Sequence, residues 1–255
     1  MLRAPVFGAG LIAIALTASA APSPAPADRI EGKLFEAANA FRAENGLAAL
    51  APDEILTAEA RDFAGYLART DRFSHTADGR SPGDRARAAG YDYCELAENI
   101  AYEEDDAGFG AERLTHLFMD GWEKSPGHRR NLLNPDVIQT GIGVARLQGR
   151  GAVQKYLAVQ VFGRPASARF SFEVENRSPR QIAFEFDGVT RQVPPLATLT
   201  ETTCARGSIS FQHFGRRPSS YAVEPGARYV LTESTGGLQV EIVRGHAPDG
   251  RSERD

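Results

Sequence analysis

Residues 121–135 read GWEKSPGHRRNLLNP, and they are the most informative segment of the chain. A serine, a proline and a glycine stand directly before His128, which predicts a turn whose backbone positions the imidazole. A helix is expected to lead into this turn over residues 109–123, because its apolar residues recur at helical spacing and place Trp122 in the core. The segment therefore predicts a helix that delivers a histidine to a functional site.

Two other segments carry polar residues that a purely structural stretch would not need. Residues 73–91, FSHTADGRSPGDRARAAGY, place His75 among turn-forming residues, and Glu98 interrupts the apolar strand pattern LAENIAY. An ionised carboxylate in such a strand is costly unless a donor meets it, and an imidazole is a natural donor. We therefore expect His75, Glu98 and His128 to converge in one cleft. The alternatives are histidines that only pin loops and a glutamate that only caps backbone amides.

The remainder of the first 165 residues mixes helical and strand patterns. Helices are expected over residues 30–41, 52–67 and 81–90, and strands over residues 96–102, 141–145 and 154–162. The last of these strands is nearly continuously apolar, as a strand covered on both faces would be. Helices before, between and beside a few strands predict an α/β fold in which helices sandwich a sheet.

After residue 165 the pattern changes to short strands that alternate with period two. Such strands are expected over residues 170–175, 182–186 and 238–243, with turn signals between them and no convincing helix. This spacing predicts a small all-β sandwich over residues 166–246, followed by a disordered tail over residues 247–255. The β-domain carries no lectin, cofactor or catalytic motif, so we expect it to support the first domain or to act as a positioning module.

The N-terminus has the form of a secretory signal peptide. Arg3 precedes an apolar stretch over residues 6–16, and residues 18–20 form an Ala-x-Ala cleavage signal. The stretch is too short for a spanning helix, so we expect a signal peptide over residues 1–20, a linker over residues 21–29 and no permanent membrane span. The protein is accordingly expected to be secreted or periplasmic.

Charge and cysteine content narrow the function further. From Ala166 onward 11 arginines balance 11 acidic residues, so the net charge of −4 belongs to the first 165 residues, and no basic field for nucleic acid is present. The two cysteines, Cys94 and Cys204, fall one in each expected domain. In an oxidising compartment a disulfide between them would tie the domains together, and two free thiols are the alternative.

These motifs resemble the CAP superfamily of cysteine-rich secretory, antigen-five and pathogenesis-related proteins, and most of all its bacterial secreted branch, whose unit is the SCP domain. Five ordered motifs over about residues 30–165 carry the resemblance: FRAENGL at 41–47, SHTADG at 74–79 with GY at 90–91, ENIA at 98–101, Trp122 with SPGHR at 125–129, and the glycine-rich hairpin from residue 140.

The resemblance implies an α/β/α sandwich with a large cleft lined by two histidines and two acidic residues. His75, Glu98 and His128 match three of these positions, whereas Ser125 stands at the fourth. Glu123 is the substitute offered there, and its alternative role is a solvated carboxylate in the last helical turn.

Three uses of the cluster follow. A divalent cation such as zinc or calcium could be held by His75, His128 and Glu98, with Glu123 as a fourth ligand. A metal-assisted hydrolase could act on an ester or a peptide, although neither H-E-x-x-H nor G-x-S-x-G is present. The third use is recognition without catalysis, and the resemblance implies no single reaction. We therefore predict an extracellular or periplasmic binding protein for a lipid, glycan or protein ligand, with the hydrolase as the alternative.

Other polar residues are given structural roles. Asn99 is expected to bond loop backbone, the acidic run over residues 103–106 to form a solvated loop rather than a cation site, and His116, His213 and His246 to be unrelated to the cleft.

Overall fold

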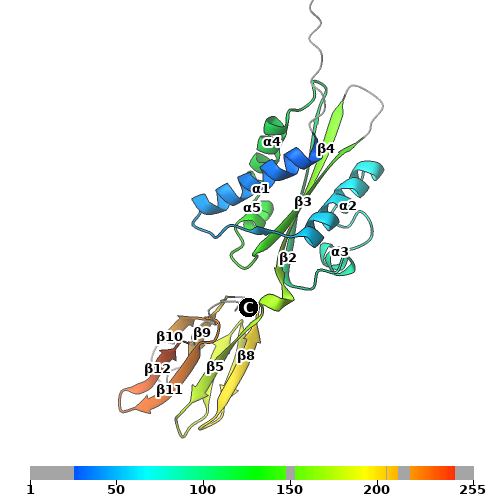
Figure 1. Ribbon diagram of the computed structural model, residues 1–255. Helices are drawn as coiled ribbons and strands as arrows, with labels where there is room; N and C mark the ends of the chain where they lie inside the picture. The colour runs from blue at the N-terminus through cyan, green and yellow to red at the C-terminus, as the bar shows by residue number, and fades with distance from the viewer. Residues whose placement is uncertain (1–25, 148–152, 205, 212–218, 245–255) are drawn as a thin grey trace, which may run out of the picture.

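The computed structural model describes residues 26–147, 153–204, 206–211 and 219–244 of the 255-residue chain. The expected signal peptide, the tail over residues 247–255, His213 and His246 lie outside these residues. The described residues form a layered α/β module and a second module built of strands, which extends from one end of the first (Figure 1). No helix in these ranges is both long and apolar enough to cross a membrane.

The first module is built on a four-stranded sheet. Its strands are β1 (Ala51–Pro52), β3 (Gln139–Leu147), β4 (Gln154–Pro165) and β2 (Tyr93–Asp105), in the order β1-β3-β4-β2. β1 pairs with β3 in parallel, and the other pairs are antiparallel. β4 is buried without interruption from Tyr156 to Arg164, as its apolar sequence predicts. β2 is an edge strand, so one of its backbone edges is open to contacts from other elements.

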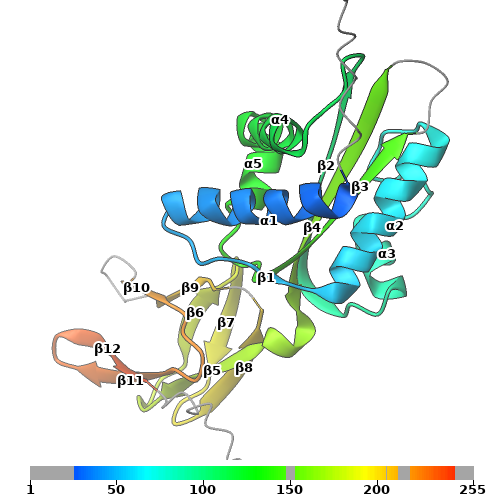
Figure 2. The ribbon, with the colours of Figure 1, turned by 45° about the horizontal axis from the view of Figure 1, so that its top comes forward.

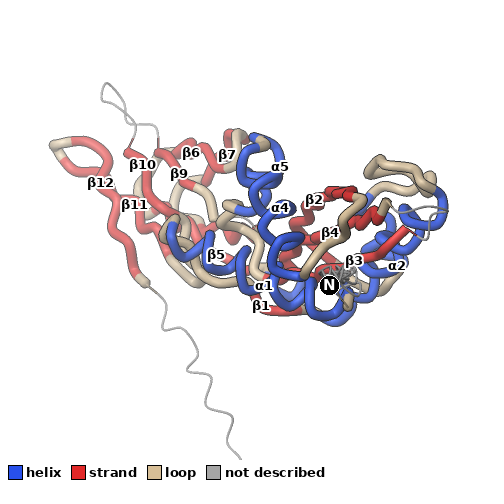
Figure 3. Tube along the Cα trace, turned by 90° about the horizontal axis from the view of Figure 1, so that it is seen from above, coloured by secondary structure: helices blue, strands red, loops and turns tan. Residues whose placement is uncertain are grey.

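Helices cover both faces of this sheet, and the expected α/β/α sandwich is confirmed (Figures 1 and 3). The helices on one face are α1 (Ala27–Glu44), α4 (Ala111–Lys124) and α5 (Pro126–Leu132), and those on the other are α2 (Glu54–Thr70) and α3 (Pro82–Ala88). Trp122, which is 1% exposed, lies in the first of the two cores. α1 begins inside the range expected to be a linker, because Ala27 already follows the helical pattern of residues 30–41.

Two glycines of β3 let α2 lie directly on the sheet. A Cβ atom at Gly141 would collide with the backbone of Leu56, and one at Gly143 would collide with the backbone of Ala60. α2 is also fixed at its start, where the side chain of Asp53 accepts a hydrogen bond from the N–H of Leu56 over 2.9 Å. The end of α2 therefore has a defined position, and the loop that carries His75 starts from it.

The second module consists of two four-stranded sheets. One has the order β10-β9-β6-β7 and the other β12-β11-β5-β8. Their strands are β5 (Phe170–Asn176), β6 (Ile182–Phe186), β7 (Val189–Val193), β8 (Thr198–Thr203), β9 (Ser208–Phe211), β10 (Ser219–Ala222), β11 (Arg228–Ser234) and β12 (Gly237–Val243). Residues from both sheets, among them Phe172 and Phe184, form one apolar core, so the expected β-sandwich is confirmed.

Two hydrogen-bonded strand pairs meet at the junction of the modules (Figure 2). The β2–β4 ladder ends at the pair Tyr93 and Pro165, and the β5–β8 ladder starts at the pair Phe170 and Thr203. A single 3₁₀ turn, η1 (Ala166–Ala168), leads from β4 to β5. The main chain therefore makes one of the two covalent connections across the junction.

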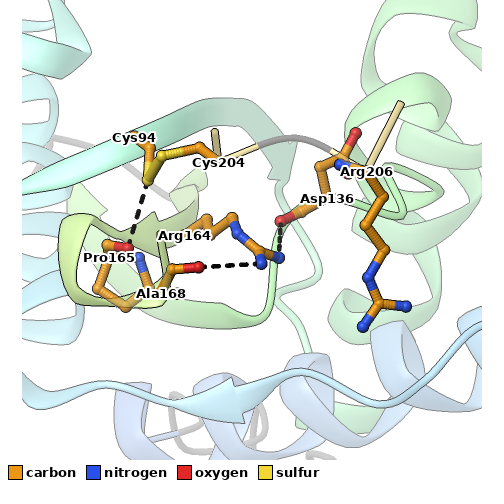
Figure 4. Close-up of a disulfide and its surroundings, with 7 residues drawn as sticks. All are labelled: Cys94, Asp136, Arg164, Pro165, Ala168, Cys204 and Arg206. Carbon is orange, nitrogen blue, oxygen red and sulfur yellow. Dashed lines mark hydrogen bonds between the residues drawn. A yellow bond between two sulfur atoms is a disulfide. The ribbon is translucent and has the colours of Figure 1, made fainter. Parts of the chain in front are cut away.

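A disulfide makes the other connection, and the expected Cys94–Cys204 bond is confirmed (Figure 4). The two Cα atoms are 5.8 Å apart across 110 residues of sequence, and the Sγ atom of Cys94 lies 3.4 Å from the carbonyl oxygen of Pro165. Next to the disulfide, the side chain of Asp136 accepts a hydrogen bond from the N–H of Arg206 over 3.1 Å. The bond thus joins the start of β2 to the end of β8.

Candidate functional site

His75 and Glu98 meet at the edge of the sheet. Nδ1 of His75 lies 2.7 Å from Oε1 of Glu98, whose side chain is 1% exposed, whereas the side chain of His75 is 46% exposed. Since an ionised carboxylate only accepts hydrogen bonds, Nδ1 carries the proton, and Nε2 is an acceptor in the neutral ring. The buried glutamate therefore selects the tautomer of a half-exposed imidazole.

Arg85 holds the other side of Glu98, and sequence reasoning missed it. Its Nη2 donates to Oε2 of Glu98, and its Nη1 donates to the carbonyl oxygen of His75 over 2.9 Å. The guanidinium is 3% exposed, so it fixes both the carboxylate and the loop that carries the histidine. The sequence signal for Arg85 was the run DRARA at residues 84–88. Two arginines in a short helix usually face solvent, and only the packing of the helix against the sheet shows that one of them is buried.

The capping box of α3 explains why Arg85 points at the sheet. The Oγ atom of Ser81 accepts from the N–H of Asp84 over 3.1 Å, and Oδ2 of Asp84 accepts from the N–H of Ser81 over 3.2 Å. Pro82 stands in the first turn, where its missing N–H costs nothing. This start fixes the rotation of the helix and buries Arg85 and Ala86 together.

His128 lies in a helix, which corrects the expectation of a turn. Pro126 opens α5, and the helical pattern continues through the histidine because only the residues before it are turn formers. The side chain of Asn99 donates to the carbonyl oxygen of His128 over 3.2 Å, and that of Asn131 donates to Oδ1 of Asn99 over 2.8 Å and to the carbonyl oxygen of Glu98 over 3.2 Å. Asn99 thus bonds backbone, as expected, and α5 covers the open edge of β2.

A buried arginine from the FRAENGL segment fixes the other end of α5. Nη1 of Arg42 donates to the carbonyl oxygens of Leu132 and Asn134 over 2.7 and 2.9 Å. These groups lack partners at a helix C-terminus, where a cation is favourable. Arg129 lies over the ring of Phe41, with 4.9 Å from its Cζ atom to the ring centroid. The first helix therefore orients the helix of His128.

The two histidines approach β2 from opposite faces of the sheet. His75 comes from the loop between α2 and α3, and His128 comes from α5 in the other helical layer. Burial lowers the pKa of His128, and the positive charge of His75 lowers it further. His75 thus contacts Glu98 directly, and His128 lies near enough to His75 for the charge of that ring to affect its pKa. Convergence of all three side chains in one cleft stays a prediction.

The fit to a divalent metal is poor. Both oxygens of Glu98 are engaged, by His75 and by Arg85. Across the described ranges, no three histidine, cysteine or carboxylate side chains are placed so that they could hold a metal ion. Glu123 lies in the last turn of α4 and is half-buried. Binding of zinc or calcium by His75, Glu98, His128 and Glu123 stays a prediction, and the positions of these side chains do not support it.

The acidic run beside the site is a strand end and not a loop. Glu103, Glu104 and Asp105 belong to β2, because the ladder with β4 continues to the pair Asp105 and Gln154. Asp105 accepts hydrogen bonds from the N–H of Ala107 over 2.7 Å and from Arg113 over 2.6 Å, which ties it to the start of α4. His116 is exposed on α4.

Two curated proteins are similar to about half of the chain. The chain is 32% identical over 128 residues to "Uncharacterized protein YkwD" of Bacillus subtilis, covering 50% of this chain and 46% of that protein. It is 32% identical over 117 residues to "Uncharacterized membrane protein YlbC" of the same organism, covering 46% of this chain and 32% of that protein. The chain thus matches less than half the length of either relative.

Two solved structures are similar to the chain with lower sequence identity than these two relatives. An outer surface protein of Borrelia burgdorferi has a TM-score of 0.43 and 24% identity, covering 53% of this chain and 92% of that one. An extracellular protein of Bacillus anthracis containing an SCP domain has a TM-score of 0.44 and 24% identity, covering 54% of this chain and 41% of that one.

A family model supplies the assignment. The model described as "CAP: Cysteine-rich secretory protein family" matches residues 35–162, which is half of the chain. This range starts in α1, ends in β4 and contains His75, Glu98 and His128. The chain therefore belongs to the cysteine-rich secretory protein (CAP) family.

Proposed function

We propose that this protein is an extracellular or periplasmic binding protein whose recognition groups are the imidazoles of His75 and His128. The contact of 2.7 Å between His75 Nδ1 and Glu98 Oε1 carries the proposal, because it presents Nε2 of a half-exposed ring in a preset tautomer. A group oriented before binding loses less entropy when a ligand arrives. The disulfide supports an oxidising compartment.

The surroundings of His75 favour recognition over nucleophilic catalysis. The neighbouring hydroxyl of Ser74 is bonded to Thr76. Its Oγ atom lies 3.3 Å from Oγ1 of Thr76 and accepts a hydrogen bond from the N–H of Thr76 over 3.2 Å. In the described part of the chain, neither imidazole forms a hydrogen bond with a serine or threonine hydroxyl that it could activate. The alternative is a hydrolase that activates water with His75, Glu98 and His128, with or without a metal ion.

An exposed aromatic pair, formed by Tyr102 of the same strand and Phe73 of the loop after α2, favours a glycan as the ligand. Tyr102 follows Glu98 by four residues, so both side chains leave the same face of β2, about 13 Å apart along the strand. Phe73 meets Tyr102 edge to face with 4.9 Å between ring centroids, and each residue is 45% exposed. Aromatic faces with a few polar groups suit a ligand that combines apolar C–H faces with hydroxyl groups, as sugars do.

The test compares wild type with the double variant His75→Ala/His128→Ala and with the exposed control His116→Ala. All three are applied to a glycan array that includes N-acetylglucosamine oligomers, and to a panel of ester and peptide substrates with and without zinc or calcium. We expect glycan binding in wild type and in His116→Ala, at least tenfold weaker binding in the double variant, and no turnover. Metal-dependent turnover that the double variant loses would replace the binding proposal by the hydrolase.

A further inference from the structure

A cavity lies between α2 and α3, apart from the two histidines. It is half-open to solvent and has a volume of about 660 Å³, and its walls include Glu59, Asp62, Tyr66, Asp78, Arg80 and Arg85, with the exposed Arg69 near the end of α2 beside them. α2 supplies the first three of these residues, the loop after it supplies the next two, and α3 supplies Arg85. Neither His75 nor His128 lines it.

With the imidazole of His75 neutral, the ion cluster beside this cavity has one more negative charge than positive charges. Three carboxylates are buried, with side-chain exposures of 4% for Glu59, 7% for Asp78 and 1% for Glu98. Arg85 forms ion pairs with all three, and Arg80 pairs with Asp78 from a more exposed position. Two guanidinium groups therefore serve three carboxylates. A buried charge without compensation is unstable, so the cluster favours one additional proton or cation.

Glu59 is the place where that compensation is missing. Its Oε1 accepts from Nε of Arg85 over 2.7 Å, whereas its Oε2 is buried and has no hydrogen-bond partner in the described residues. Burial raises the pKa of Glu59 to about 7, against the opposing effect of Arg85. The groups that act on it are Arg85 from α3, Asp78 from the loop and Glu98 from β2. At neutral pH a proton and a cation would compete for this carboxylate.

The walls of the cavity suit an organic cation. Tyr66 is half-buried and offers part of an aromatic ring, which attracts a cation, and Asp62 is an exposed carboxylate one helical turn from Glu59. The volume also exceeds the need of a single ion. We propose that this cavity binds a small organic cation through a primary ammonium group, with Glu59 as its buried partner and Asp62 at the entrance.

The proposed site is connected to the histidines through Arg85, yet it does not rest on their role. The guanidinium that pairs with Glu59 also bonds Glu98, which in turn holds His75. Three contacts thus connect Glu59 to the imidazole: Glu59 to Arg85, Arg85 to Glu98, and Glu98 to His75. Failure of glycan binding would leave the cation site standing, because the two experiments measure different ligands.

The test is isothermal titration of the full-length protein with n-butylammonium, with sodium butyrate as the anionic counterpart. We expect saturable binding of the cation, at least tenfold weaker binding in Glu59→Gln, and unchanged binding in Glu54→Gln, an exposed glutamate on the same helix. At pH 6 the binding heat should change with the ionisation heat of the buffer, because the ammonium group displaces a proton from Glu59, and Glu59→Gln should lose this dependence.

A second variant keeps the test valid if Glu59→Gln disturbs the fold. Asp62→Asn changes an exposed side chain and should weaken n-butylammonium about threefold without a change in the melting temperature. Equal binding in wild type and Glu59→Gln, or equal binding of butylammonium and butyrate, would overturn the proposal. So would tight binding of calcium that Glu59→Gln abolishes and butylammonium does not compete for, because the site would then be a metal site.

Discussion

His75 and Glu98 are 23 residues apart in the sequence, yet their Nδ1 and Oε1 atoms are 2.7 Å apart in the structure. On its other side the same carboxylate meets Arg85, so one buried group orients an imidazole and neutralises a guanidinium. The orientation of the His75 ring thus depends on the ion pair between Glu98 and the buried Arg85.

Glu98→Gln should separate these two roles. The substitution leaves the buried Arg85 with one carboxylate fewer, so the free energy of unfolding should fall by about 3 kcal/mol in urea denaturation. It also replaces an acceptor-only carboxylate by an amide that can accept through its oxygen or donate through its nitrogen, so Nδ1 of His75 need no longer carry the proton and ¹⁵N NMR should show a mixture of tautomers. Glu104→Gln, on the exposed part of the same strand, should change stability by less than about 0.5 kcal/mol. An unchanged His75 spectrum in Glu98→Gln would contradict the assigned role.

His128 should titrate below the ordinary histidine value of 6.5, because burial and the charge of His75 both disfavour its protonated form. NMR titration should show this lowered pKa, and His75→Ala should raise it part of the way back while burial remains. The unfolded chain binds this proton more readily, so the contribution of His128 to stability is complete above pH 6.5 and is lost as the pH falls through the lowered pKa. A midpoint in His75→Ala equal to that of wild type would show that the rings do not interact.

Glu59 should give stability the opposite pH dependence. Its pKa rises from 4.5 to about 7 on folding, so its contribution is fully present below pH 4.5 and is lost as the pH rises through 7. The size of this effect is about 3 kcal/mol, and the difference between wild type and Glu59→Gln isolates it from the titration of His128. Urea unfolding at pH 4.5, 6 and 7.5 measures it, with Glu54→Gln as the control. Parallel stability curves for wild type and Glu59→Gln would argue against a raised pKa.

Loss of the disulfide should destabilise the chain strongly. In the chain-entropy model, a bond that closes a loop of 110 residues stabilises the folded state by roughly 4–5 kcal/mol. Cys94→Ala/Cys204→Ala should therefore unfold at a lower urea concentration than the oxidised wild type. Denatured, non-reduced wild type should contain no titratable thiol at these positions, and two thiols per chain would refute the bond.

The glycines of β3 should not tolerate a side chain. Gly141→Ala and Gly143→Ala force α2 away from the sheet, since the added Cβ meets the helix backbone, and each should cost about 3 kcal/mol in urea unfolding. Gly121→Ala is the matched control, because it lies in α4 with open space around the added atom. There alanine should stabilise by about 0.5–1 kcal/mol. An unchanged free energy of unfolding in Gly141→Ala and Gly143→Ala would show that α2 can shift without loss of stability.

Much of the fold was predictable because its patterns are local. The helical spacing of residues 30–41, the start of a helix at residue 81 and the alternation over residues 182–186 each depend on neighbours in the chain, and each appears in the structure. The apolar pattern on both sides of Glu98 also indicated that this carboxylate needs a donor. These local patterns appear in the structure because the same apolar residues also pack in the cores.

The rest of the site could not be predicted from local patterns. Arg85 differs from Arg87 only in the side of a seven-residue helix on which it stands, and only the packed sheet makes one buried and the other exposed. His128 belongs to a helix because Arg42, from a distant segment, supplies partners for carbonyl groups at the end of α5. Glu103 and Glu104 extend a strand because β4 supplies a ladder, although their charges favour a loop.

The junction between the modules also determines how a mechanical load would travel. The main chain connects β4 to β5, and the disulfide connects β2 to β8, so two neighbouring strands of each module carry the connection. Tension on the β-sandwich would pull on β2 and β4 together instead of peeling one strand from the other. Because Glu98 lies on β2, the geometry of His75 would be protected from force only while the disulfide is intact.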